Sequence, residues 1–137
     1  MKTNYNFDEL SKVFASVSKI EKLAAAQIEA EKAYNEKGNA FDAEFAKYNY
    51  SFFNAPKELH VMFNEKCALM DARDKAEKKA YKAVKEFAAF VEAGNGPTDW
   101  VEDEVKAYVE RKSYFLIDKI ARYCTYLAVD IANRVRC

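Results

Sequence analysis

Glycine and proline are so scarce in this chain that few turns can interrupt it. The 137 residues include three glycines and two prolines, at Gly38, Pro56, Gly94, Gly96 and Pro97. These residue types mark turns, and a β-protein of this length would need many more of them. Neither type occurs between Pro56 and Gly94. The sequence therefore predicts an all-α protein built from a few long helices.

The N-terminal part carries apolar residues at helical spacing, and Asn6 or Asp8 can cap the start of a helix there. Gly38-Asn39 is a helix stop signal, so we expect the first arm to be kinked near Gly38. The first apolar stripe comprises Leu10, Val13, Val17, Ile20 and Ala24, and a second, aromatic stripe follows Gly38 at Phe41, Phe45, Tyr48 and Phe52.

Two further segments each have helical periodicity. One runs from Pro56 to Ala93, and the other from about Asp99 to Arg134, joined by the turn signal Gly94-Asn95-Gly96-Pro97. Each spans roughly 38 residues, or about 57 Å, and equal helices joined by a short turn form an antiparallel hairpin. The sequence thus predicts an elongated antiparallel three-helix bundle in a single domain covering residues 1–137. A compact four-helix bundle, with residues 40–53 as a separate helix, is the alternative.

Charge and hydropathy exclude several kinds of partner. Lysine plus arginine number 22, as do aspartate plus glutamate, so no net basic field attracts nucleic acid. The longest uncharged stretch, Tyr48–Pro56, is too short to cross a membrane. Asp8 and Glu9 interrupt the N-terminal segment before a secretory signal could form. We therefore expect a cytoplasmic protein that contacts no membrane.

The residues that usually carry catalysis or metal binding are few and scattered. His60 is the single histidine, and Cys67 follows it by two helical turns, too far for a hydrogen bond within one helix. The three cysteines, Cys67, Cys124 and Cys137, have no metal-finger spacing, and we expect them to be reduced thiols. The sequence predicts no enzyme activity, no cofactor and no metal.

A polar stripe near the C-terminus could line a pocket. Tyr114, Asp118, Arg122, Tyr126, Asp130 and Arg134 follow one another at steps of four residues. If the stripe were buried, Arg122 could bind an anionic group between Tyr114, Asp118 and Tyr126, which makes a small-ligand-binding bundle one alternative function. The simpler interpretation is a set of helix-stabilising Asp–Arg pairs with tyrosines at the edge of the core.

A lysine-rich stretch on the third segment could contact phosphates. It comprises Lys75, Lys78, Lys79, Lys82 and Lys85. Acidic residues are interleaved with it, however, so its net charge is small and a solvated helix face is the better interpretation. Weak nucleic-acid binding through the Lys75–Lys85 face stays an alternative function.

The aromatic stretch before Pro56 is the best candidate for a contact surface. Phe52 and Tyr48 belong to the aromatic stripe, whereas Tyr50 and Phe53 point away from it on a helical wheel. Exposed aromatics are typical of protein interfaces. The alternative, that the stretch caps the bundle from within its core, stays open at this point. We expect Tyr48, Tyr50, Phe52 and Phe53 to bind another protein chain.

In composition, the chain resembles small accessory proteins of bacteriophages and mobile elements, which are short, helical and rich in Lys, Asn, Tyr and Phe. That resemblance implies a protein that binds a host or competitor protein, or serves as a scaffold, in the host cytoplasm. The sequence therefore favours a non-catalytic protein–protein interaction module, whose partner is a foreign target or a second copy in a homodimer.

Overall fold

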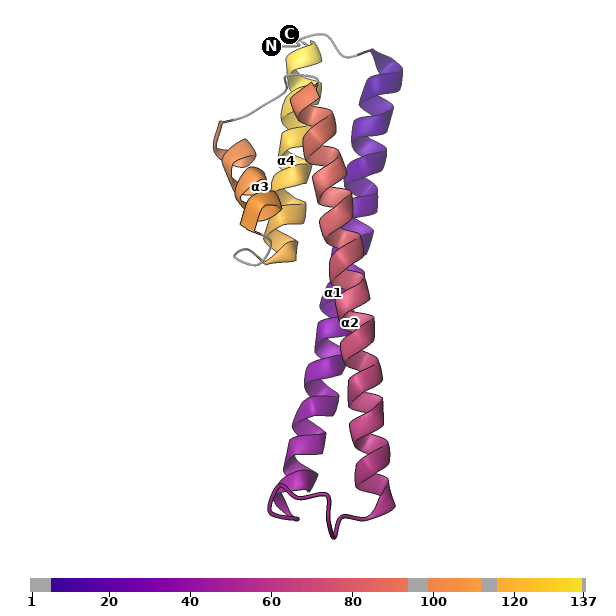
Figure 1. Ribbon diagram of the computed structural model, residues 1–137. Helices are drawn as coiled ribbons and strands as arrows, with labels where there is room; N and C mark the ends of the chain where they lie inside the picture. The colour runs from indigo at the N-terminus through magenta and orange to yellow at the C-terminus, as the bar shows by residue number, and fades with distance from the viewer. Residues whose placement is uncertain (1–5, 94–98, 112–115, 137) are drawn as a thin grey trace. The chain divides into compact units, whose positions relative to one another are not determined.

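The computed structural model describes residues 6–93, 99–111 and 116–136. These residues form four α-helices and no strand (Figure 1). The helices are α1 (Phe7–Ala46), α2 (Lys57–Ala93), α3 (Asp99–Arg111) and α4 (Ile117–Arg136). The predicted all-α helical bundle is confirmed. None of these helices is long and apolar enough, within the described residues, to cross a membrane.

Local sequence signals explain where α1 begins, but not that it passes through Gly38. The backbone N–H of Glu9 donates to the Asn6 side-chain oxygen at 2.8 Å, so Asn6 is the capping residue. The helix end expected at Gly38-Asn39 was wrong, because α1 continues unbroken to Ala46. The kink expected near Gly38 stays a prediction. A glycine within a helix costs only about 1 kcal/mol relative to alanine, and packing of the residues around it against α2 offsets that cost.

The prediction of a single helix from about Asp99 to Arg134 was also wrong, because the structure has α3 and α4 in its place. Tyr108 and Ile117 are both buried, yet nine residues separate them. Nine residues correspond to about two and a half helical turns, so one continuous helix would present these side chains on opposite faces. Two helices that pack on each other bury both.

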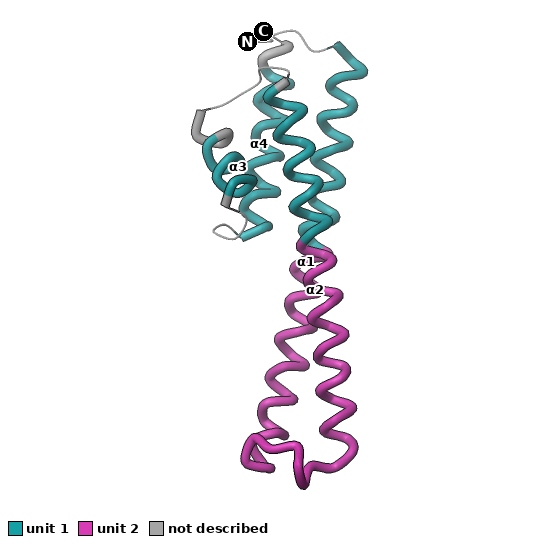
Figure 2. The backbone as a smooth tube through the Cα atoms, in the orientation of Figure 1, with its two compact units in different colours: residues 1–25, 78–137 teal, residues 26–77 magenta. Residues whose placement is uncertain are grey.

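The chain divides into two compact units (Figure 2). Unit 1 comprises residues 1–25 and 78–137, and unit 2 comprises residues 26–77. Helices α1 and α2 each supply residues to both units.

Unit 1 has a core of aliphatic and small side chains from all four helices. The stripe predicted for α1 is confirmed, since Val13, Val17, Ile20 and Ala24 are buried. A side-chain hydrogen bond of 2.9 Å from the Thr125 hydroxyl to the Glu21 carboxylate joins α4 to α1. The other buried residues are Ala80, Ala83, Val84, Phe87 and Val91 of α2, Val105 and Tyr108 of α3, and Ile117, Ile120, Ala121, Cys124, Leu127, Ala128 and Ile131 of α4.

The C-terminal end of helix α3 is attached to α2. The Tyr81 hydroxyl donates to the Val109 carbonyl oxygen at 2.7 Å. That oxygen belongs to the last turn of α3, where carbonyls have no partner within the helix. The Tyr81 ring also lies 5.8 Å from the Tyr108 ring. A single tyrosine thus supplies both a cap and an aromatic contact for α3.

Unit 2 is a helical hairpin in which cations cover aromatic rings. The Lys66 ammonium lies 5.2 Å from the centroid of the buried Phe41 ring, and the Arg73 guanidinium lies 4.3 Å from that of Tyr34. Both cations come from α2 and both rings from α1. Lys66 and Arg73 are charged side chains on the side of α2 that faces α1, and these cation–π contacts explain how they are accommodated there.

Candidate protein-binding surface

The segment between α1 and α2, residues 47–56, is an ordered turn that we call the aromatic turn. The N–H groups of Tyr50 and Asn49 donate to the carbonyl oxygens of Phe45 and Ala46, at 3.1 and 3.2 Å. This is the Schellman pattern that ends a helix, and it needs a left-handed residue at the position of Asn49, whose φ is 55°. An aromatic stripe on a helix was predicted through Phe52, but α1 ends at Ala46, before it.

Tyr50 has an unusual backbone conformation for a large side chain. Its φ is 57°, in the left-handed region that bulky residues rarely adopt. Its ring packs edge-on against Phe45, with the centroids 5.7 Å apart. An apolar contact of this kind commonly accompanies the Schellman motif. The turn therefore holds Tyr50 in one position at a cost in backbone energy.

A cluster of rings packs against the aromatic turn. Phe52 lies at its centre, with its ring 4.7 Å from Phe45 and 5.0 Å from the stacked His60 ring. Aromatic pairs at such distances contribute about 0.5–1.5 kcal/mol each beyond their buried area. The remaining ring contacts of the cluster are Phe41–Phe45 at 5.1 Å, Phe41–Phe52 at 6.1 Å, Phe41–Phe63 at 5.6 Å and Phe52–Phe63 at 5.4 Å.

Exposure separates the four predicted contact residues into two pairs. Tyr48 and Phe52 are half-buried, whereas Tyr50 is 70% exposed and Phe53 is 91% exposed. The exposure expected for Tyr50 and Phe53 is observed, and Phe52 belongs to the ring cluster. The Phe53 N–H donates to the Ser51 hydroxyl at 3.2 Å, which orders the backbone on which this exposed ring stands.

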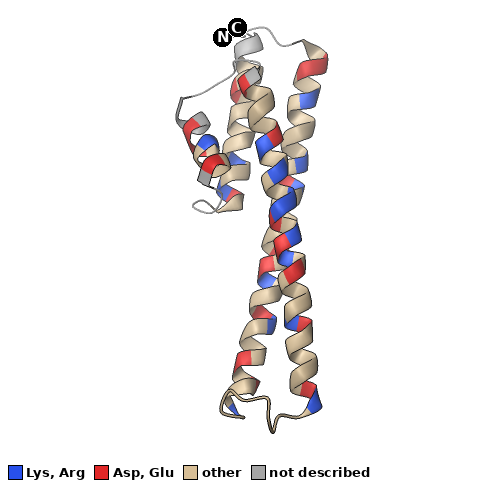
Figure 3. Ribbon diagram, viewed as in Figure 1, with Lys and Arg blue, Asp and Glu red and all other residues tan. Residues whose placement is uncertain are grey.

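The aromatic turn carries no charge between its two flanking lysines. Residues 48–56 contain no acidic or basic side chain, and Figure 3 shows this end of the hairpin in the colour of uncharged residues. Lys47 pairs with Glu44 at 2.9 Å, and this hydrogen bond raises the pKa of Lys47 above its ordinary value. Lys57 begins α2 and is exposed. Few charges must therefore be desolvated when a partner covers Tyr50 and Phe53.

The polar stripe near the C-terminus does not form a buried pocket among the described residues. Asp118 and Arg122 are exposed, and Tyr126 is 50% exposed. The Asp118 carboxylate instead accepts a hydrogen bond from the N–H of Lys119 at 2.8 Å. Tyr114 lies outside the described residues. Asp118, Arg122 and Tyr126 are therefore too exposed to line a buried pocket, whereas Asp130 of the same stripe is half-buried. Ligand binding by this stripe stays a prediction.

The histidine and cysteine side chains considered for catalysis or metal binding form no reactive site among the described residues. His60 is exposed and stacks on Phe52. Burial raises the pKa of the Cys124 thiol to about 12, which keeps it protonated and unreactive. Cys67 is a free, half-buried thiol, and Cys137 lies outside the described residues. Within residues 6–93, 99–111 and 116–136, no cluster of His, Cys, Asp or Glu could hold a metal ion.

The lysine-rich stretch of α2 is solvated, as predicted. Its five lysines are all exposed: Lys75, Lys78, Lys79, Lys82 and Lys85. None of them contacts a ring or a carboxylate among the described residues. Their binding properties stay a prediction.

Sequence reasoning missed two features of the aromatic turn. The roles of His60 and Phe63 as ring partners of Phe52 were not anticipated, although both lie in the first two turns of α2, close in sequence to the turn. The end of α1 at Ala46 was missed too, because Asn49 was not recognised as a left-handed helix-ending residue in place of glycine.

Comparison with protein families, with curated proteins and with solved structures finds no match to this chain.

Proposed function

We propose that this protein is a non-catalytic protein-binding module whose contact surface is the aromatic turn. The observation that carries the proposal is the exposure of Tyr50 and Phe53 on a turn whose backbone is fixed by hydrogen bonds. Tyrosine and other large aromatic residues are enriched among the side chains that dominate binding energies. The partner is a foreign protein or a second copy of this chain.

Preorganisation of the turn supports this proposal. A left-handed Tyr50 costs of the order of 1–3 kcal/mol, and such strain is concentrated at functional sites. The ring cluster around Phe52 holds the turn before any partner arrives. A preformed surface loses less conformational entropy on binding than a flexible one, which raises affinity.

The resemblance in composition to phage and mobile-element accessory proteins suggests a source for the partner. Such proteins commonly bind a host or competitor protein. We infer that the aromatic turn engages an apolar hollow on its target, since residues 48–56 offer rings and no charge.

The test removes the two exposed rings together, as Tyr50→Ala with Phe53→Ala. Loss of a binding hot spot costs about 2 kcal/mol or more, so affinity for the partner should fall at least about thirtyfold. Sedimentation measures self-association, and affinity capture with quantitative mass spectrometry measures foreign targets. Circular dichroism should show unchanged helix content, because both side chains are exposed.

A matched control removes one phenylalanine and one tyrosine exposed in unit 1, as Phe7→Ala with Tyr126→Ala. This variant should retain the partner. If the turn variant folds and still binds every partner of the unaltered protein, the aromatic turn is not the contact surface. If the turn variant unfolds, Tyr50 and Phe53 are structural residues and the proposal fails as well.

A further inference from the structure

Unit 1 contains a groove between α1 and α2, separate from the aromatic turn. Its volume is about 370 Å³, within the range of about 300–1,000 Å³ that is typical of small-molecule sites. One wall comes from α1 and the other from α2, over eight residues of each, a length of about 10 Å. The groove is lined by Lys12, Ala15, Ser16 and Lys19 of α1, and by Ala83, Glu86, Phe87 and Phe90 of α2.

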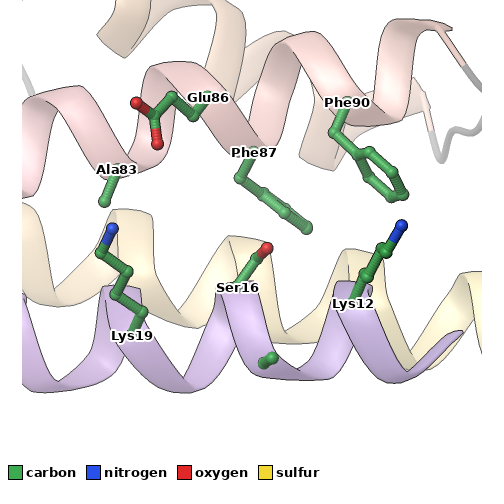
Figure 4. Close-up of a pocket in the computed structure, with 8 residues that line it drawn as sticks. Lys12, Ser16, Lys19, Ala83, Glu86, Phe87 and Phe90 are labelled. Atoms are coloured by element: carbon green, nitrogen blue, oxygen red, sulfur yellow. The ribbon is translucent and has the colours of Figure 1, made fainter. Parts of the chain in front are cut away.

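The two walls differ in chemistry. Figure 4 shows the ammonium groups of Lys12 and Lys19 and the hydroxyl of Ser16 directed across the groove toward the α2 wall. The α2 wall opposite them is largely apolar, with Phe87 buried and the half-buried Phe90 beside it. Small side chains at Ala15 and Ser16 leave space in front of the half-buried Phe90, whereas Phe87, which is 1% exposed, presents almost no surface to the groove.

The charges in the groove are not neutralised by one another. Lys12, Lys19 and Glu86 are all described residues, and none of them takes part in an ion pair in the structure. Asp8 lies one turn before Lys12 on α1 but forms no ion pair with it either. Two ammonium groups against one carboxylate leave the lining with a net charge of +1 (2 − 1 = +1).

The two ends of the groove are electrostatically unequal. Figure 4 places the Glu86 carboxylate on the Ala83 side of Phe87, toward Lys19. Lys12 lies at the other end, opposite Phe90, where the lining has no carboxylate. An anionic group is therefore attracted to the Lys12 end and repelled from the Glu86 side.

We propose that this groove binds a small organic anion with a flat apolar body, such as an aromatic carboxylate or sulfonate. The apolar body lies against Phe90 and Ala15, and the anionic group accepts a hydrogen bond from the Lys12 ammonium. The Ser16 hydroxyl is within the lining and supplies a further donor. This site would give the protein a ligand-binding function in addition to the proposed protein contact.

The test compares two probes that share an aromatic body and differ in charge: anilinonaphthalene sulfonate, an anion, and phenylnaphthylamine, which is neutral. Both are measured by fluorescence titration on a protein carrying Tyr50→Ser and Phe53→Ser, so that neither exposed ring of the aromatic turn contributes. The anionic probe should bind more tightly than the neutral one. Equal affinities would overturn the proposal.

Three substitutions in that background locate the site. Lys12→Gln should weaken the anionic probe about tenfold, as expected for loss of a charge-assisted hydrogen bond, and leave the neutral probe unchanged. Glu86→Gln should strengthen the anionic probe a fewfold. Lys85→Gln, which removes an exposed lysine of α2 outside the groove lining, is the control and should change neither probe. Equal effects of Lys12→Gln and Lys85→Gln would contradict the site.

Filling the groove completes the test. Ser16→Phe should abolish binding of both probes, because a ring at that position fills the groove that Ser16 lines. If Ser16→Phe lowers the helix content, Ala15→Trp replaces it, since Ala15 is exposed and a larger side chain there displaces no core residue. Unchanged binding of the anionic probe in the folded filling variant would show that it binds elsewhere.

Discussion

Unit 1 and unit 2 use the same two long helices but bury different kinds of side chain. In unit 1, aliphatic and small side chains from four helices form the core, as at Val84, Ile120 and Leu127. In unit 2, two helical segments enclose rings, and cations lie over Phe41 and Tyr34. A pair of helices has little interior to fill, so its side chains stay close to solvent and combine apolar area with charge. The difference shows that a hairpin with few buried aliphatic side chains, Leu59 among them, can be ordered when aromatic rings occupy its centre.

Surface ion pairs contribute little to the stability of unit 2. Unit 2 has the Lys37–Glu65 pair and a Lys66–Asp42 contact of 3.9 Å, all from partly or largely exposed side chains. Exposed pairs typically contribute about 0–1 kcal/mol each. The ring contacts of Phe41, buried and shared among several partners, therefore carry more of the stability of unit 2.

The largest expected effect follows from removing that ring. Phe41→Ala deletes a buried phenylalanine that contacts Phe45, Phe52 and Phe63, and should destabilise the protein by about 3–5 kcal/mol. Hydrogen exchange should show the loss of protection concentrated in residues 26–77. Phe41→Leu, which keeps apolar volume, is the control and should cost less. Equal loss of protection throughout unit 1 would show that the two interiors do not differ in the way described.

Unit 1 should respond most to added volume in its core. Ala80 is fully buried in the core of unit 1. Ala80→Leu should therefore overpack the core and cost about 1–3 kcal/mol, measured by chemical denaturation. Ala89→Leu, at an exposed position on the same helix, is the matched control and should have little effect. An unchanged stability of Ala80→Leu would mean that this core is loosely packed.

The buried thiol of unit 1 gives it a dependence on alkaline pH. The pKa of Cys124 is raised from 9.0 to about 12 because burial disfavours the thiolate. Its stabilising contribution is complete below about pH 9 and declines by about 1.4 kcal/mol per pH unit as the pH rises toward 12, since the unfolded thiol ionises first. The stability of Cys124→Ala, measured over the same range, should fall less steeply. Parallel curves for the two proteins would refute this origin of the pH dependence.

The sequence predicted the helical class and most of the α1 core. Apolar residues at steps of three and four lie on one face of a helix, and that face is buried whichever helix packs against it. It did not predict the separation of α3 from α4, although the half-turn offset between Tyr108 and Ile117 is visible in the spacing. It predicted the exposure of Tyr50 and Phe53, since a single hairpin cannot cover rings on all sides. The groove was not predicted, because it arises where small residues of α1 meet Phe87 across two distant segments.

The smallest expected effect concerns Gly38, where a sequence signal and the fold disagree. Glycine commonly ends a helix, yet Gly38 lies inside α1 of unit 2 without a positive φ. A Cβ added there would meet the Lys66 side chain at 3.6 Å, an ordinary van der Waals contact. Gly38→Ala should therefore stabilise the protein by about 0.5–1 kcal/mol, because alanine loses less backbone entropy in a helix.

Thermal and chemical denaturation measure this gain, and hydrogen exchange should place it in residues 26–77. An increase confined to unit 2 would distinguish the two units, because a hairpin of two helical segments depends more on helix propensity than a four-helix core does. Ala40→Gly, at an exposed position two residues further along α1, is the reverse control and should destabilise unit 2 by a similar amount. A loss of stability in Gly38→Ala would instead show that the glycine is required for the close passage of Lys66 over Phe41.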